Sequence, residues 1–190
     1  MSGKAGILGR AATYRDLEMV PDGLKGEILD GDLWVSPHPM RRHQYAGMQL
    51  VLELGPSFQD GRGGPGGWHL LYEPELAFDG DVLIPDLAGW RSARLVKFLE
   101  RGPIINAPDW VCEIISPSTE KIDRTLKKRI YARHGVRFLW FVDPIKRRLE
   151  VMRLTAGEWT PVLDVKDDSV AAAEPFDALP FSLARLWPER

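Results

Sequence analysis

The 190-residue sequence has very little cysteine, and it lacks long apolar runs and an excess of either charge. Its single cysteine, Cys112, excludes an internal disulfide and any zinc site built from several cysteines, as is typical of a reducing compartment. No stretch approaches 18 apolar residues, and the first ten residues do not resemble an export signal. We therefore expect a cytoplasmic protein that has no membrane partner.

The charged residues almost balance, with 25 Lys and Arg against 27 Asp and Glu. Such a chain has no overall attraction for nucleic acid, so any phosphate-binding surface must come from local clustering of basic side chains. With 44% hydrophobic residues, the chain has enough apolar side chains for a real core. The length and the uniform composition predict a loose N-terminus over residues 1–12 and a single domain over residues 13–190.

The pattern of apolar residues and turn residues predicts a mixture of helices and strands. Asp30 and Gly31 separate two apolar segments, which indicates a β-hairpin. The glycine-rich stretch 61–67 lacks the ending of a phosphate-binding loop and is interpreted as a plain connection. Helices are expected at 14–19, 40–54 and 118–134, with a helical turn at 95–100. Strands are expected at 25–29, 33–36, 68–72, 75–78, 82–90, 110–115, 137–142, 148–154 and 158–163, and an apolar C-terminal segment 181–187 is expected to dock on the core. This order predicts an α/β (α+β) fold with a central mixed sheet flanked by helices, preceded by an N-terminal helix and a β-hairpin.

Two acidic residues, Asp86 and Glu113, lie among apolar neighbours at positions predicted to be strands. A carboxylate in a buried strand is costly unless it is paired, protonated or bound to a cation. If the strands are neighbours, both carboxylates could face one point and bind Mg²⁺ or Mn²⁺. The alternative is that each acid lies on an edge strand and faces solvent or an arginine.

The long predicted helix places Asp123, Lys127 and Tyr131 along one face, because they are spaced four residues apart. Lys127 could reach toward a site above the sheet, although an ordinary surface pair with Asp123 is the simpler interpretation. The same segment, 120–134, holds six basic residues against two acidic ones, a local excess that would suit a phosphate partner or form a solvated face. Its candidate nucleic-acid-binding residues are Lys121, Arg124 and Lys128.

These motifs, in their order along the chain, resemble the Uma family of predicted restriction endonucleases. The matching residues are the run 26–33, Ser36 and Pro37 followed by His43, the run 85–87, the run 108–119, the triplet Asp123, Lys127 and Tyr131, and the runs 135–136 and 140–144. The family is similar to a branch of the PD-(D/E)XK nuclease superfamily, which implies a restriction-endonuclease-like fold.

The resemblance also implies roles for individual residues. Asp86 and Glu113 would hold Mg²⁺ or Mn²⁺ together with the backbone carbonyl of Ile114. The superfamily lysine normally stands two residues after the glutamate, but this sequence has Ile115 there, and Lys127 would replace it. Glu27 would be a further ligand or a partner of a metal-bound water. His43 matches the family's histidine, although a structural role near the start of a helix is at least as plausible from the residues alone.

The function implied is a metal-dependent endonuclease that hydrolyses phosphodiester bonds of DNA. A chain of this length leaves little room for a separate recognition domain, and cutting both strands together needs two active sites, so a homodimer is expected. The alternative is a catalytically silent protein of the same fold that binds nucleic acid or a protein partner.

Overall fold

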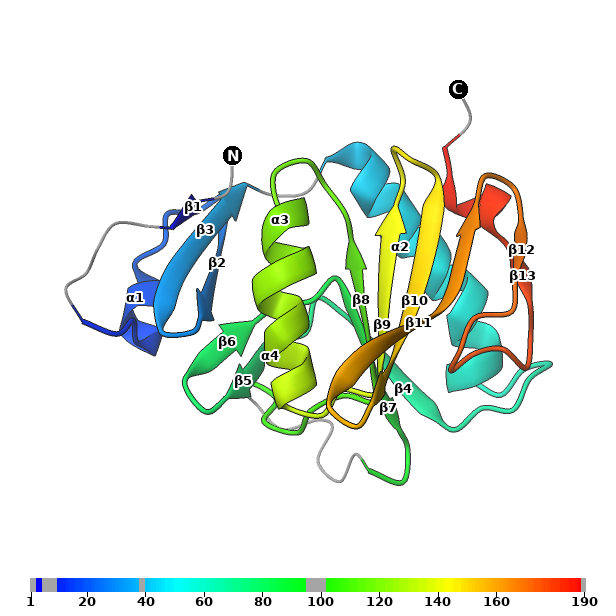
Figure 1. The fold of residues 1–190 in the computed structure, drawn as a ribbon, viewed down its shortest axis with the longest axis horizontal. Coiled ribbons are helices and arrows are strands. Elements are labelled where there is room, and N and C mark those ends of the chain that lie inside the picture. The colour runs from blue at the N-terminus through cyan, green and yellow to red at the C-terminus, as the bar shows by residue number, and fades with distance from the viewer. Residues whose placement is uncertain (1–2, 5–9, 38–39, 95–101, 189–190) are drawn as a thin grey trace.

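The computed structural model describes residues 3–4, 10–37, 40–94 and 102–188. Its centre is a six-stranded sheet with the order β11-β10-β9-β8-β7-β4, beside which lies a five-stranded sheet with the order β1-β3-β2-β6-β5 (Figure 1). In the six-stranded sheet β8 and β9 are parallel and the other neighbours are antiparallel, so the sheet is mixed as the sequence predicted. The strands of the six-stranded sheet are β4 (Trp68–Tyr72), β7 (Leu87–Arg91), β8 (Trp110–Ile114), β9 (Phe138–Asp143), β10 (Arg148–Thr155) and β11 (Glu158–Lys166).

The five-stranded sheet contains the predicted hairpin. Asp30 and Gly31 both adopt positive φ, 51° and 80°, as the tight turn between its two strands requires. Short α1 (Tyr14–Glu18) precedes the hairpin, as expected. The strands of this sheet are β1 (Gly3–Lys4), β2 (Leu24–Leu29), β3 (Asp32–Pro37), β5 (Leu76–Phe78) and β6 (Asp81–Leu83).

Helices cover both faces of the six-stranded sheet (Figure 1). On one face, α2 (Arg41–Leu54) packs with the C-terminal segment against the side chains of Trp110, Cys112 and Ile114. On the other face, the helix after β8 packs against Val111 and Ile115. Because successive side chains of a strand point to opposite faces, Glu113 lies on the same face as Val111 and Ile115.

The predicted long helix forms, but it is not a uniform α-helix. It consists of α3 (Glu120–Ile122), a π-helical turn at Asp123–Lys127 and α4 (Lys128–Arg133), and it ends at Gly135, which has φ 72°. A π turn inserts an extra residue into the helical ladder and often occurs at functional sites. The sequence could not reveal the π turn, since the four-residue spacing of Asp123, Lys127 and Tyr131 fits an ordinary α-helix equally well.

The C-terminal part also agrees with the sequence. The last segment docks through β13 (Phe181–Ser182) and a 3₁₀ turn, Leu183–Leu186, whose Leu183 and Leu186 are fully buried. β13 pairs with β12 (Val170–Ala171), a strand that the sequence did not indicate. None of the described helices is long and apolar enough to cross a membrane.

Three predictions differ from the structure or fall outside it. The predicted strand 82–90 is two strands, β6 and β7, in different sheets, because Pro85 has no N–H for a ladder and the chain changes sheet there. Within residues 1–12, which are expected to be loose, Gly3–Lys4 pairs with the edge of β3, and the looseness of the segment as a whole stays a prediction. The helical turn predicted at 95–100 lies outside the described residues.

Gly47 sets how closely α2 approaches the sheet behind the candidate site. A Cβ at Gly47 would lie 3.0 Å from the Tyr72 ring and 3.1 Å from Ile114 Cδ1. Gly47→Ala should therefore lower the free energy of unfolding by about 1–3 kcal/mol, as overpacking usually does.

Met48→Ala is the matched control, because Met48 neighbours Gly47 on the same helix but is 56% exposed. It should change the free energy of unfolding by less than about 0.5 kcal/mol. Urea unfolding of both variants tests the contact, and equal stabilities would contradict it.

Candidate active site

A cavity of about 280 Å³ lies where β2, the end of β8, the start of α2 and the π turn meet. Its lining is dominated by ionisable side chains that are mostly buried. Four carboxylates, two lysines and one histidine line it: Glu27, Asp86, Glu113, Asp123, Lys25, Lys127 and His43. This single cavity brings together all five side chains that the sequence analysis named as catalytic.

Asp86 follows Pro85 in the break between β6 and β7, rather than in the interior of a strand as predicted. Its Oδ2 accepts a hydrogen bond of 2.7 Å from the Ile114 backbone N–H and lies 3.1 Å from His43 Nε2. The contact with Ile114 holds Asp86 against β8, so Asp86 and Glu113 are adjacent to the same strand end. β7, which begins directly after Asp86, pairs with β8, so the condition under which both acids could face one point is met.

Lys127 is almost completely buried, at 2% exposure, and ends the π turn. Its Nζ lies 2.8 Å from Glu113 Oε1, 3.1 Å from Glu27 Oε1 and 3.7 Å from Asp123 Oδ1. The lysine thus reaches across to the sheet, and the alternative interpretation, a pair with Asp123 on the surface, does not hold because both side chains are buried. Tyr131, one turn further along, donates a hydrogen bond to the same Glu113 oxygen.

The carboxylates use their oxygens unequally. Glu113 makes its described contacts through Oε1 only. Glu27 also uses only Oε1, which contacts Lys127 and the Ile84 N–H. Asp86 uses only Oδ2. The second oxygen of each side chain therefore remains able to bind a further ligand. Such a set of carboxylate oxygens is the kind of donor that Mg²⁺ and Mn²⁺ prefer.

Burial and crowding of like charges act strongly on two of these acids. Burial raises the pKa of Glu113 to about 8, with further contributions from Asp123 and Asp86, although Lys127 opposes the shift. Burial also raises the pKa of Asp123 to about 6. A cation would relieve this crowding, because four carboxylates face only two lysines.

Asp86 and Lys127, in contrast, are held in their charged forms. Burial alone would raise the pKa of Asp86, but the hydrogen bond from His43 and the charges of Lys25 and Lys127 bring that pKa below its usual value. Burial likewise opposes the charge on Lys127, yet Glu113 and Glu27 raise its pKa well above the ordinary value. The site therefore holds a permanent ammonium group beside an ionised aspartate.

The raised pKa of Glu113 predicts a specific pH dependence of stability without added metal. Between the unfolded pKa, near 4.5, and the folded pKa, about 8, the folded chain binds a proton that the unfolded chain has lost. The free energy of unfolding should therefore fall as the pH rises through this window. Urea unfolding between pH 5 and pH 9 measures this dependence. Glu113→Gln should flatten it, and an unchanged slope in that variant would contradict the assignment.

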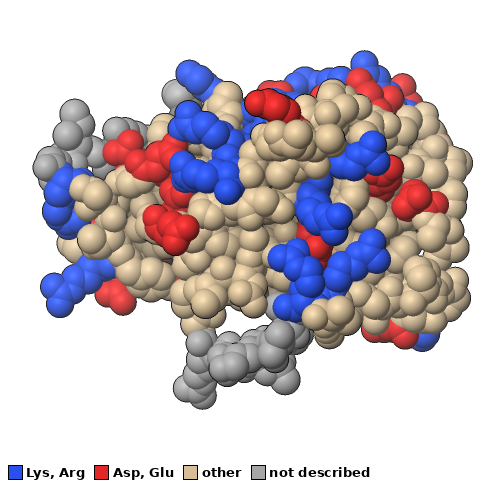
Figure 2. Space-filling model, turned by 60° about the horizontal axis from the view of Figure 1, so that its bottom comes forward, with Lys and Arg blue, Asp and Glu red and all other residues tan. Residues whose placement is uncertain are grey.

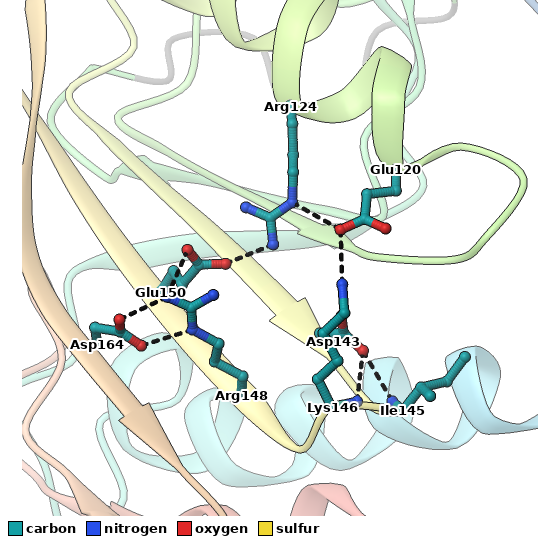
Figure 3. A network of polar contacts seen from close by, with 8 residues as sticks. All are labelled: Glu120, Arg124, Asp143, Ile145, Lys146, Arg148, Glu150 and Asp164. Atoms are coloured by element: carbon teal, nitrogen blue, oxygen red, sulfur yellow. Dashed lines mark hydrogen bonds and ion pairs between the residues drawn. The ribbon is translucent and has the colours of Figure 1, made fainter.

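The predicted nucleic-acid-binding residues do not line this cavity. Arg124 belongs to the network in Figure 3, where it pairs with Glu120 and with Glu150, and it also lies over the ring of Phe141. Lys121 is exposed and Lys128 is partly buried. On the face drawn in Figure 2, Lys and Arg side chains occur in separate groups with Asp and Glu between them. Binding of nucleic acid by these three residues stays a prediction.

Lys25 and Asp123 also line the cavity, although neither was among the predicted site residues. Lys25 stands two residues before Glu27 on β2, so strand periodicity places both on one face and could have indicated it. No group of three or more His, Cys, Asp or Glu side chains in the described part of the chain is arranged to hold a metal ion. Three of the carboxylates instead lie around the Lys127 ammonium group.

Known proteins support the resemblance seen in the sequence. A solved structure of a "putative nuclease belonging to DUF820" from Anabaena variabilis has a similar fold, with a TM-score of 0.73 and 20% sequence identity over 90% of this chain and 94% of that chain. This likeness confirms the predicted nuclease-like mixed fold. The chain has no match among curated proteins. The Uma2 family model, described as "Putative restriction endonuclease", matches residues 11–184. Since that match covers nearly the whole chain, the protein belongs to the Uma2 family.

Proposed function

We propose that this protein is a metal-dependent endonuclease that hydrolyses phosphodiester bonds of DNA. The observation that carries the proposal is the buried Lys127 ammonium group, which lines one cavity together with Asp86 and Glu113. Burial of a lysine with several carboxylates is costly, and replacing such a cluster by apolar side chains is often neutral or stabilising. A requirement for charge at this cavity explains the cluster better than stability does.

The carboxylate oxygens of this cavity are donors that suit a divalent cation, although no three His, Cys, Asp or Glu side chains of the described residues are arranged around one point without it. Asp86 and Glu113 would hold it through the oxygens that make no described protein contact, and the Ile114 carbonyl and Glu27 are further candidate ligands. When bound, Mg²⁺ or Mn²⁺ polarises a phosphate and lowers the pKa of a bound water. His43 and the Ile114 N–H orient Asp86 by binding its other oxygen.

Lys127 supplies a fixed positive charge in a site that is largely shielded from water. A preorganised cation of this kind stabilises negative charge that develops on the phosphate, or orients the attacking water through a hydrogen bond. Glu113 and Glu27 hold its Nζ in place, and Tyr131 in turn holds Glu113. Lys127 needs no deprotonation for either role, which agrees with its raised pKa.

His43 acts as a positioning residue in this account. His43→Ala should weaken Mn²⁺ binding roughly 10- to 100-fold, as is typical when a partner of a metal ligand is lost. His43→Gln should restore part of the affinity, because its amide nitrogen can replace Nε2 as the donor to Asp86. Mn²⁺ titration followed by calorimetry tests this, with His69→Gln on β4 as a control. Wild-type affinity in His43→Ala would contradict the role.

We also propose that two copies act together when both DNA strands are cut. Each chain has one such cavity among its described residues, and a concerted double-strand cut needs two sites. Light scattering with and without a DNA duplex tests this proposal. A strictly monomeric protein that linearises plasmid in one binding event would contradict it.

The test of the function is cleavage of supercoiled plasmid and of single-stranded DNA in Mg²⁺, Mn²⁺ and EDTA. Metal-dependent cleavage by the wild-type protein, absent in Glu113→Gln purified in the same way, supports the proposal. Equal traces of cleavage in both proteins would favour the alternative, a silent protein of this fold that binds nucleic acid or a protein. One observation favours this alternative: the Lys127 ammonium group pairs with Glu27 and Glu113 and so occupies the place beside these carboxylates.

A further inference from the structure

A second cavity, of about 410 Å³, adjoins the candidate active site and shares part of its wall. Met40, His43, Ser116 and Pro117 line both cavities. The rest of the second cavity is formed by Arg41, Arg42, Ile115, Pro144 and Ile145. Its size is within the range of small-ligand pockets, and its lining combines apolar side chains with a few polar groups, as such pockets do.

The apolar part of this lining is accessible. Met40 is 69% exposed and Ile145 is 54% exposed, so two large apolar side chains stand at an opening beside the polar site. The turn that carries Ile145 is rigidly held, because the Asp143 carboxylate accepts hydrogen bonds from the backbone N–H groups of Ile145 and Lys146 (Figure 3). In this view the Ile145 side chain points away from the polar network. The apolar surface is thus preformed.

The polar part of the lining has unused binding capacity. His43 is 7% exposed, its Nε2 faces Asp86, and its Nδ1 has no hydrogen-bond partner among the described residues. Arg41 and Arg42 are exposed in the first turn of the 14-residue helix α2, and neither forms an ion pair within the described part of the chain. A helix N-terminus with two free arginines attracts a phosphate group.

We propose that this second cavity binds an unpaired nucleobase next to the phosphate that is cut, so that DNA whose bases are unpaired or leave the stack at the cleavage point is preferred over a fully stacked duplex. The inference rests on the proposed function, because the active-site cavity fixes where the phosphate lies. The base would pack against Ile145, Pro117 and Met40, beside the ring of His43. The next phosphate would lie on Arg41 and Arg42. A base within a duplex stack cannot enter such a cavity, because it would have to leave the stack first.

Beyond the second cavity, the surface again combines basic and apolar side chains. Arg42, Pro144 and Ile145 also line a further hollow of about 350 Å³, together with Arg147 and Trp187. Arg147 pairs with Asp168 through Nη2, so Arg42 is the unpaired basic side chain of this hollow among the described residues. A basic path next to an apolar pocket is the usual combination in proteins that bind single strands, where bases stack on side chains and arginines follow the backbone.

The experiment compares binding of an oligothymidylate with binding of an abasic strand of the same length and charge, by fluorescence anisotropy in Ca²⁺ to suppress turnover. The wild-type protein should bind the oligothymidylate roughly tenfold more tightly, since one stacked base contributes about that much. Ile145→Asp should reduce this ratio to about one. Val170→Asp, at a site that is 66% exposed and lies outside both cavities, is the matched control and should keep the tenfold ratio.

Arg41→Ala combined with Arg42→Ala separates phosphate contacts from base contacts. This variant should weaken binding of both strands equally and reduce the salt dependence of binding. An unchanged base preference in Ile145→Asp would overturn the inference. This holds also if Ile145→Asp changes the oligomeric state but keeps the tenfold ratio. If the wild-type protein still cuts plasmid in those cases, only the inference fails. If the wild-type protein neither binds the strands nor cuts plasmid, the proposed function fails with it.

Discussion

Replacing Lys127 with methionine should lower the rate of DNA cleavage by roughly 10²- to 10³-fold, the usual loss when one preorganised charge-stabilising group is removed. The side chain keeps most of its volume, so the change removes the charge rather than the packing. Glu113 and Glu27 would lose their cation, and the free energy of unfolding should fall by about 3–5 kcal/mol, as expected when one partner of a buried ion pair is removed. Single-turnover cleavage and urea unfolding measure the two effects.

Melting temperatures measured with and without Mn²⁺ should show whether Lys127→Met has lost catalysis or has lost its fold. Mn²⁺ should raise the melting temperature of Lys127→Met more than that of the wild-type protein, because the variant's carboxylates have no competing ammonium group. Lys127→Arg keeps the charge and should retain more activity than Lys127→Met. Wild-type cleavage by a folded Lys127→Met protein would remove Lys127 from the proposed mechanism.

Asp86→Asn should remove both metal binding and cleavage. The amide retains an oxygen that can accept the Ile114 hydrogen bond, but it carries no negative charge for the cation. A bound metal contributes several kcal/mol of transition-state stabilisation, so its loss corresponds to about 10³-fold or more in rate. Calorimetric titration with Mn²⁺ and single-turnover cleavage should report the two losses together.

Asp143→Asn is a matched control for Asp86→Asn. Asp143 is also a buried aspartate, but it accepts hydrogen bonds from a turn and does not line the proposed active site. It should keep Mn²⁺ binding and cleavage even if its stability falls. Normal Mn²⁺ affinity in Asp86→Asn would show that the metal, if bound, is held elsewhere.

Much of the fold could be predicted from local patterns. The Asp30 and Gly31 turn requires positive φ, and the residues that flank it alternate as a hairpin does, so the hairpin followed directly from the sequence. The two sheets could not be separated in this way. Pro85 breaks the ladder between β6 and β7, but whether the chain then continues in one sheet or moves to another depends on long-range packing.

The candidate site was predictable where an unusual residue type marked it. Asp86 and Glu113 stood out because acids are rare in apolar strands, and the structure brings both to one cavity. Lys127 could not be distinguished from a surface lysine by its spacing alone, since burial and the reach across to Glu113 are tertiary properties. The resemblance to a family supplied that choice. The second cavity had no sequence signal, because it is formed by the start of α2, the segment after β8 and the turn after β9, which are far apart along the chain.

Locating a bound metal ion tests the central claim most directly. A crystal of the wild-type protein soaked in Mn²⁺ should show an anomalous-scattering peak at ligand distance from carboxylate oxygens of both Asp86 and Glu113. The same soak of an Asp86→Asn crystal should show no peak there. A Mn²⁺ peak at another place in the wild-type crystal, or a peak in this cavity that survives in Asp86→Asn, would contradict the account.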